Sequence, residues 1–153
     1  MSFIIMPLPL ELSESAHTMM KETLMSAYGV SVQFSDMKDV EQNYRAAGGE
    51  FWVAIKEGTI LGTIALLDVG LGRGYLKRMY VHKNWQRKGI GSSLLRTLVQ
   101  FAAENGMGAI YLGTIEGSPS EGFFRASGFV RTALPDDLDT YGDKVFFKLL
   151  ISK

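Results

Sequence analysis

The chain has 153 residues, of which 46% are apolar and 21% charged, which is the size and composition of one ordinary globular domain. Its 16 basic and 16 acidic side chains balance, so a nucleic-acid partner is not expected, because proteins of that kind usually carry a basic excess. There is no cysteine, which excludes disulfides, thiolate nucleophiles and cysteine-bound zinc, and no metal ligand set is predicted.

The first segment, MSFIIMPLPLEL, lacks a basic start and is interrupted by Pro7 and Pro9. It therefore predicts a strand over residues 3–7 rather than a signal peptide. No apolar run approaches the roughly 20 residues that a membrane helix needs. We expect a soluble cytoplasmic protein without a membrane partner.

Helical spacing of apolar residues predicts a first helix from about Leu12 to Tyr28. A second helix is expected to begin with Ser35 as its N-cap and to end at Gly48-Gly49. Its predicted apolar face comprises Met37, Val40, Tyr44 and Ala47. Residues 50–70 then hold two apolar runs divided by Glu57 and Gly58, which is typical of a β-hairpin.

Residues 74–82, GYLKRMYVH, predict a strand with strict alternation. One predicted face carries Tyr75, Lys77, Met79 and Val81, and the other carries Leu76, Arg78 and Tyr80. After a glycine-containing loop, apolar spacing predicts a helix that Gly106 closes. A strand over 109–114, a short helix within 120–129, an acidic loop over 134–143 and a closing strand over 144–151 follow. The predicted order, β-α-α-β-β-β-α-β-α-β-β, favours an α/β (α+β) fold with helices covering a mixed sheet.

The loop QRKGIG, residues 86–91, lies between a predicted strand and a predicted helix. It lacks the Gly-Lys-Ser/Thr order of a Walker A loop and the third glycine of the dinucleotide fingerprint, since Leu94 stands there. Its glycines would still let backbone N–H groups at the helix start approach a pyrophosphate. Arg87 and Lys88 would add positive charge, and the Ser92 hydroxyl could donate. A plain strand-to-helix turn is the simpler reading of the loop alone.

The order of elements together with two motifs resembles the GNAT superfamily of N-acetyltransferases. Gln86–Gly91 is similar to that family's Gln/Arg-x-x-Gly-x-Gly/Ala loop. GFFRASGF is similar to its aromatic-aromatic-x-x-x-Gly-Phe segment, with Phe123, Phe124, Gly128 and Phe129 at the matching positions. The resemblance implies a single domain over residues 1–153, with a mixed, mostly antiparallel sheet of six to seven strands flanked by about four helices.

The resemblance also implies a site for acetyl-coenzyme A. The strand before the loop would splay from the next one and offer main-chain groups to the pantetheine arm, while the loop would bind the pyrophosphate. A main-chain N–H would stabilise the thioester oxygen as an oxyanion-hole donor. The residues expected to bind the cofactor are Met79, Tyr80, Val81, Gln86, Arg87, Lys88, Gly89, Ile90, Gly91, Ser92 and Phe124.

Two positions depart from the family's usual acid–base set. Phe124 stands where many members carry a tyrosine that protonates the thiolate, and Tyr75 stands about where many carry a glutamate base. An ordinary tyrosine is protonated at pH 7 and is a poor base. Tyr141 and Glu116 are the first alternates, although each is also explained as a surface residue. Positioning of the two reactants without a dedicated base is the remaining possibility.

Three functions follow from this reading. The first is an N-acetyltransferase that passes an acetyl group from acetyl-coenzyme A to a primary amine of a small molecule, amino acid or peptide, by direct attack in a ternary complex. The second is a non-catalytic acyl-coenzyme A sensor with the same fold. The third is a glycine-rich nucleotide-binding module. Four aspartates in the acidic loop (Asp136, Asp137, Asp139 and Asp143) could attract a cationic amine or simply be solvated. A monomer and a homodimer are both compatible with the sequence.

Overall fold

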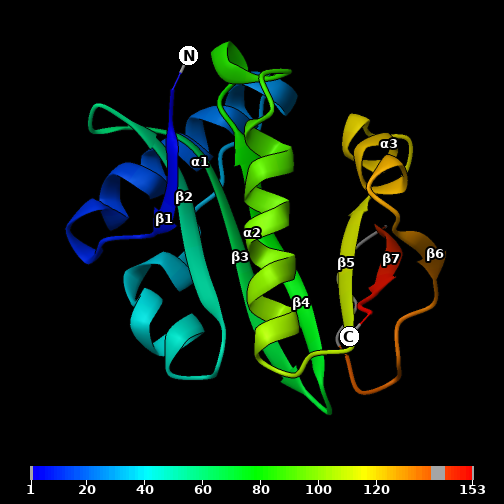
Figure 1. Ribbon diagram of the computed structural model, residues 1–153. Coiled ribbons are helices and arrows are strands. Elements are labelled where there is room, and N and C mark those ends of the chain that lie inside the picture. Colours follow the sequence, from blue (N-terminus) through cyan, green and yellow to red (C-terminus); the bar gives the residue numbers. More distant parts are fainter. Residues whose placement is uncertain (1, 139–143, 153) are drawn as a thin grey trace.

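The computed structural model describes residues 2–138 and 144–152 (Figure 1). The strands and α-helices along the chain are β1 (Ile4–Pro7), α1 (Ser13–Tyr28), β2 (Glu50–Lys56), β3 (Thr59–Gly70), β4 (Arg73–Val81), α2 (Ile90–Glu104), β5 (Ala109–Ile115), α3 (Pro119–Ala126), β6 (Val130–Thr132) and β7 (Lys144–Leu150). Short helical turns are η1 (Leu10–Leu12), η2 (Ser35–Lys38), η3 (Glu41–Arg45) and η4 (Lys83–Trp85). The predicted strands and the first and third predicted helices are confirmed to within a few residues at their ends.

All seven strands belong to one mixed sheet in the order β1-β2-β3-β4-β5-β7-β6. Neighbouring strands are antiparallel except β4 and β5, which are parallel and joined through α2. The predicted hairpin is confirmed between β2 and β3, where Glu57 and Gly58 have φ values of 50° and 79°. Two residues of positive φ match the right-handed twist of the strands that they connect.

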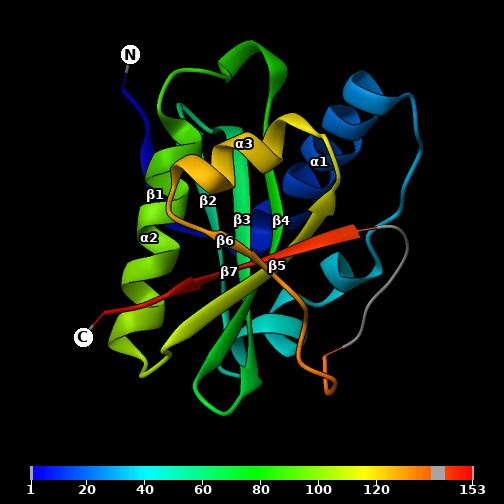
Figure 2. The same ribbon diagram turned by 90° about the vertical axis from the view of Figure 1, so that its right-hand side faces the viewer.

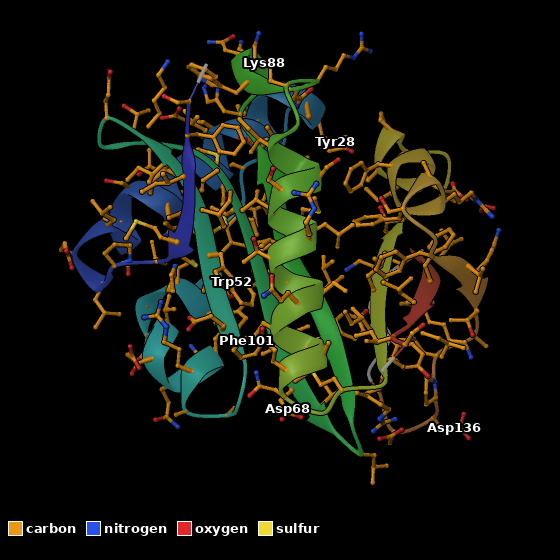
Figure 3. All side chains as sticks on the ribbon, in the orientation of Figure 1. Tyr28, Trp52, Asp68, Lys88, Phe101 and Asp136 are labelled. Carbon is orange, nitrogen blue, oxygen red and sulfur yellow. The ribbon has the colours of Figure 1, made fainter. Side chains whose placement is uncertain are left out.

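Helices cover both faces of the sheet (Figures 1 and 2). On one face, α2 and α3 bury a cluster that includes Leu94, Leu98 and Phe124 against the strands. On the other face, α1 and the turns η2 and η3 bury a second cluster around Met20 and Tyr44. Trp52 belongs to the α2 cluster and packs edge-on against Phe101, with ring centroids 5.2 Å apart (Figure 3).

The second predicted helix is wrong as one continuous α-helix. Its region folds as the 3-10 turn η2 followed by the single π-helical turn η3. Asp39 separates them with an extended backbone (φ −150°, ψ 81°), and its carboxylate accepts the Gln42 N–H at 2.9 Å. An aspartate that bonds the backbone in this way competes with continuous helix. Ser35 is not the N-cap, because Phe34 occupies that position and no side chain caps the turn.

The strict alternation predicted for β4 is also wrong. Leu76 contributes to the α2 cluster, but so do Met79 and Val81, while Tyr80 packs on the α1 cluster. The reversal occurs at Arg78, whose φ is +56°, where the register with β3 shifts between Thr63 and Ala65. An extra residue in one strand is a β-bulge, and it turns all later side chains to the opposite face.

No helix among residues 2–138 and 144–152 has both the length and the apolarity that a membrane crossing requires.

Candidate active site

Strands β4 and β5 form a fork. They pair only at Arg73–Ala109, Gly74–Ile110 and Tyr75–Tyr111, although β4 continues to Val81 and β5 to Ile115. Figure 1 shows the two strands diverging toward the end at which α2 begins. The expected splay is therefore confirmed, and it starts directly after Tyr75. Beyond this point, β4 can offer main-chain groups to a ligand lying between the strands.

The bulge in β4 lies at the fork and is held by β3. Thr63 is fully buried and donates its hydroxyl to the Arg78 carbonyl at 2.7 Å. In a trans peptide the C=O and the following N–H point in opposite directions. Because the Arg78 carbonyl points to the Thr63 hydroxyl, the Met79 N–H points away from that hydroxyl. This orientation suits a donor for an oxygen bound in the fork.

The glycine loop after β4 has the backbone of an anion-binding turn. Arg87 and Gly89 both have positive φ, 62° and 83°. Gly89 is the N-cap of α2, and no side chain caps that end. The N–H groups of the first helical turn, from Ile90 to Ser92, have no carbonyl one turn earlier to bond. They therefore point out of the helix, together with its positive dipole end.

The side chains of this loop differ in what they can contribute. Ile90 is 1% exposed and belongs to the core, so its N–H alone is available. Ser92 is exposed, and Lys88 extends outward at the start of α2 (Figure 3). A side chain at Gly89 would meet no atom within 4 Å. The turn thus has open space at Gly89 and the positively charged Lys88 side chain beside it.

Gln86 links the loop to β4. Its side-chain amide donates to the Val81 carbonyl at 3.1 Å. His82 caps η4, since its Nδ1 accepts the Asn84 N–H at 3.2 Å. Both contacts fix the path of the chain between the last residue of the strand and the glycines. The expected contact of Gln86 with the cofactor stays a prediction.

Helix α3 lies next to the start of α2. Gly91 at the start of α2 lies next to Met79 and Phe123, since a Cβ built on it would be 3.5 Å from Met79 Cε and 3.7 Å from the Phe123 ring, both ordinary contact distances. Phe124 is 4% exposed and packs edge-on between Phe123 and Phe129, with centroids 5.3 and 5.5 Å away. The Gly-Phe segment is therefore an apolar wall, and the Phe124 ring has no proton to give.

Tyr75 lies at the apex of the fork. Its hydroxyl would lie 3.1 Å from a Cβ on Gly113, so the absence of a side chain on β5 makes room for it. Tyr75 is half-buried, and this burial raises the pKa of its phenol above the ordinary value. The group keeps its proton at neutral pH and can donate a hydrogen bond there, which makes it a poorer base than an ordinary tyrosine.

Of the other two predicted catalytic candidates, the structure describes Glu116. Glu116 follows β5 and is 68% exposed, with its carboxylate 3.3 Å from Arg131. Tyr141 lies outside the described residues, as do Asp139 and Asp143. Asp137, in the acidic segment, accepts two hydrogen bonds from Arg73, one of them at 3.0 Å, and this pair occupies the end of β4 away from the loop. The role of Glu116 stays a prediction.

A half-buried ion pair lies beside the bulge. Asp36 in η2 accepts two bonds from Arg78, at 2.9 and 3.0 Å, and a third from the Tyr44 hydroxyl. The Arg78 guanidinium also lies 4.6 Å from the centre of the Phe34 ring. Burial raises the pKa of Asp36, but these donors outweigh it and hold that pKa below its usual value. Asp36 and Phe34 thereby connect the segment between α1 and η3 to Arg78 of β4.

Thr63, Asp36 and the bulge at Arg78 were not anticipated from the sequence. A threonine inside the apolar run TILGTIALLDV is a weak sign of a buried hydroxyl that needs a partner. The pairing of Asp36 with Arg78, 42 residues apart, has no local signal.

The sequence and the fold were compared with those of known proteins. A model of the acetyltransferase (GNAT) family matches residues 17–129. The structure of a GNAT-family acetyltransferase from Staphylococcus aureus Mu50 is 26% identical, with a TM-score of 0.91 over 99% of this chain and 100% of that one. The PaiA N-acetyltransferase of Thermoplasma acidophilum, solved in complex with coenzyme A, shares the fold at 19% identity, with a TM-score of 0.78 over 98% and 99% of the two chains.

Curated relatives match over shorter stretches. The N-acetylaspartate synthetase of Xenopus tropicalis is 39% identical over 88 residues, which are 52% of this chain and 30% of that protein. The probable N-acetyltransferase family 8 member 5 of Mus musculus is 34% identical over 104 residues, 64% of this chain and 46% of that protein. The chain thus spans between about a third and a half of the length of these relatives.

Proposed function

The chain belongs to the acetyltransferase (GNAT) family, and we propose that it transfers an acetyl group from acetyl-coenzyme A to the primary amine of a small molecule, amino acid or peptide. The two reactants meet in a ternary complex, and the amine attacks the thioester directly. The proposal must account for two departures from the family's usual acid and base. Phe124 stands in place of a tyrosine, and Tyr75 stands in place of a glutamate.

The observation that carries the proposal is the separation of β4 from β5, followed along the chain by helix α2, whose N-terminus has no side-chain cap. Main-chain groups of β4 beyond Tyr75 have no partner on β5, and the uncapped first turn of α2 follows the same strand. An extended amide-containing chain attached to a pyrophosphate fits this order of donors. The residues proposed to bind it are Met79, Tyr80, Val81, Gln86, Arg87, Lys88, Gly89, Ile90, Gly91, Ser92 and Phe124, with Ile90 contributing its N–H and Phe124 its apolar face.

The chemistry requires little from side chains. The amine nitrogen forms a bond to the acetyl carbon, the bond from carbon to sulfur breaks, the nitrogen loses a proton to solvent and the thiolate gains one. The Met79 N–H stabilises the negative charge that develops on the carbonyl oxygen. The protonated Tyr75 hydroxyl lies at the apex, donates a proton to the departing sulfur and regains a proton from solvent. Holding the reactants together supplies much of the remaining rate.

Thermal unfolding with acetyl-coenzyme A tests the cofactor first, with ATP and NAD as controls. A ligand at one hundred times its Kd adds about 2.7 kcal/mol to the free energy of unfolding. This corresponds to a rise of about 5–10 °C in the midpoint for a chain of this size. A rise with acetyl-coenzyme A alone supports the proposal, and no rise at saturation contradicts it.

Release of free thiol with a panel of primary amines tests the reaction. Turnover that depends on both acetyl-coenzyme A and an amine is the expected result. A midpoint shift without turnover for any amine of the panel would instead favour the acyl-coenzyme A sensor, because binding would be kept and chemistry absent.

A further inference from the structure

Lys77 is a half-buried lysine on β4, one residue before the bulge. It lies opposite Ala65 of β3, on the face of the sheet that α1 covers. Tyr75, two residues earlier, faces the same way, so both side chains flank the apex of the fork. A lysine here is close to the place where an amine must attack.

No carboxylate among residues 2–138 and 144–152 forms an ion pair with Lys77. The charges that act on it are positive at Arg78 and Lys144 and negative at Asp36. Asp36 is already bonded by Arg78 and Tyr44 and is not available as its partner. Half-buried ammonium groups usually have an anionic partner, because desolvation disfavours their charge.

The phosphates of the cofactor cannot be that partner. Val81 is four residues beyond Lys77, about 13 Å along an extended strand, and the glycine loop lies farther still. Of the two reactants, the acceptor is therefore the one that can bring an anion to Lys77.

We propose that Lys77 binds a carboxylate of the acceptor, so that the substrate class is a free amino acid or another amine bearing a nearby carboxylate, rather than a simple alkylamine or a peptide N-terminus. This inference rests on the proposed function. It is carried by the position of Lys77 beside Tyr75 at the apex, by its partial burial, and by the lack of an ion-pair partner in the described part of the chain.

The test compares proteinogenic amino acids with their α-carboxamides in the thiol-release assay. The two members of each pair differ in the carboxylate and, through it, in the basicity of the amine, so rates are compared at equal concentrations of the neutral amine. Charge-assisted hydrogen bonds to carboxylates correspond to about 10- to 100-fold in affinity. We expect the wild-type protein to prefer the best amino acid over its carboxamide by that factor in kcat/KM, mainly through KM for the acceptor.

Lys77→Met removes the charge at similar length, and it should bring the carboxylate-to-carboxamide ratio to about one. Its KM for acetyl-coenzyme A and its activity on the carboxamide should stay near the wild-type values, which separates lost recognition from misfolding. Lys77→Arg should retain most of the preference. Lys21→Met, which removes a half-buried lysine from α1, is the matched control and should keep the wild-type ratio.

Equal use of amino acid and carboxamide by the wild-type protein would overturn this inference and leave the proposed function standing. A ratio unchanged in Lys77→Met would also overturn it. Absence of turnover with every amine, with no stabilisation by acetyl-coenzyme A, would contradict the proposed function itself.

Discussion

The hydroxyl of Thr63 on β3 donates to the carbonyl of Arg78 on β4 at 2.7 Å, inside the core and at the residue where the alternation of β4 reverses. Arg78 has a φ of +56°, which a non-glycine residue adopts at a cost in free energy. The hydrogen bond stabilises this conformation and fixes the direction of the next N–H.

Thr63→Val removes that donor with little change in volume. The free energy of unfolding should fall by about 1–3 kcal/mol, because the Arg78 carbonyl loses a buried partner. We also expect kcat to fall about tenfold or more with little change in KM for acetyl-coenzyme A, because the Met79 N–H is no longer held in one direction. Thr63→Ser keeps the hydroxyl and should recover most of kcat. Lower stability with unchanged kcat in Thr63→Val would show that the contact is structural only.

Replacement of Gly89 tests the anion site. Gly89 has a φ of 83° and open space around it, so asparagine and aspartate are accommodated with modest strain. Gly89→Asp places a negative charge at the first-turn N–H groups of α2 and should weaken binding of acetyl-coenzyme A by about 100-fold or more. Gly89→Asn has nearly the same shape and should weaken it by about tenfold or less. Calorimetric titration of both variants measures the difference, and equal affinities would show that no phosphate lies at Gly89.

Tyr75→Phe tests the proton donor at the apex. If the phenol protonates the departing thiolate, kcat should fall by about 100-fold, at the low end for general acid catalysis. Because burial raises the Tyr75 pKa, the group stays protonated through neutral and mildly alkaline pH. With an acceptor amine of pKa below 8, we expect kcat to be level from about pH 8 to pH 10. A continued tenfold rise per pH unit in that range would indicate a tyrosinate base instead.

Glu116→Gln tests the exposed alternate. The Glu116 carboxylate is 68% exposed and pairs with Arg131 at the surface. We therefore expect kcat to change by less than about twofold and the free energy of unfolding by less than about 0.5 kcal/mol. A large fall in kcat with unchanged stability would restore Glu116 as a catalytic residue.

Asp36→Asn tests the tie across β4. The Asp36–Arg78 side chains are 17% and 21% exposed, and loss of the carboxylate should lower the free energy of unfolding by about 1–3 kcal/mol at pH 7. The folded-state pKa of Asp36 lies below its unfolded value near 3.8, so its stabilisation is complete above that value and is lost as pH falls through the folded pKa. The difference between wild type and variant should therefore shrink below about pH 4. Denaturant titrations at pH 7 and pH 3 measure this difference in the free energy of unfolding. The same difference at both pH values would contradict a stabilising Asp36–Arg78 ion pair.

Local chemistry made much of the fold predictable. Glu57-Gly58 marks the hairpin because a two-residue turn needs positive φ, and Gly89 marks the start of α2 for a related reason. The loop and the Gly-Phe segment were likewise identifiable from short motifs. These features depend on residues close together in the chain.

The features that were missed depend on tertiary contacts. Arg78 has no intrinsic preference for the left-handed region, and tertiary contacts with Thr63 on β3 and Asp36 in η2 stabilise it there. The apolar spacing of 35–47 matches a helix, but Asp39 breaks it through its own hydrogen bond. Burial of Lys77 beside Tyr75 depends on where the β4–β5 ladder ends, which no local pattern indicates.

The three-pair junction between β4 and β5 also has a consequence for cooperativity. Strands β5, β7 and β6 are joined to β1–β4 through the sheet by those pairs alone, and otherwise by the packing of α2 and α3. A ligand that lies in the fork hydrogen-bonds the sheet edge that the missing pairs leave open, and so acts as part of the sheet. Binding then couples the two halves into one unfolding unit, and amide exchange at Met79–Val81 should slow together with exchange in β5. An acyl donor bound there, as proposed, would serve both as a reactant and as an added strand of the sheet.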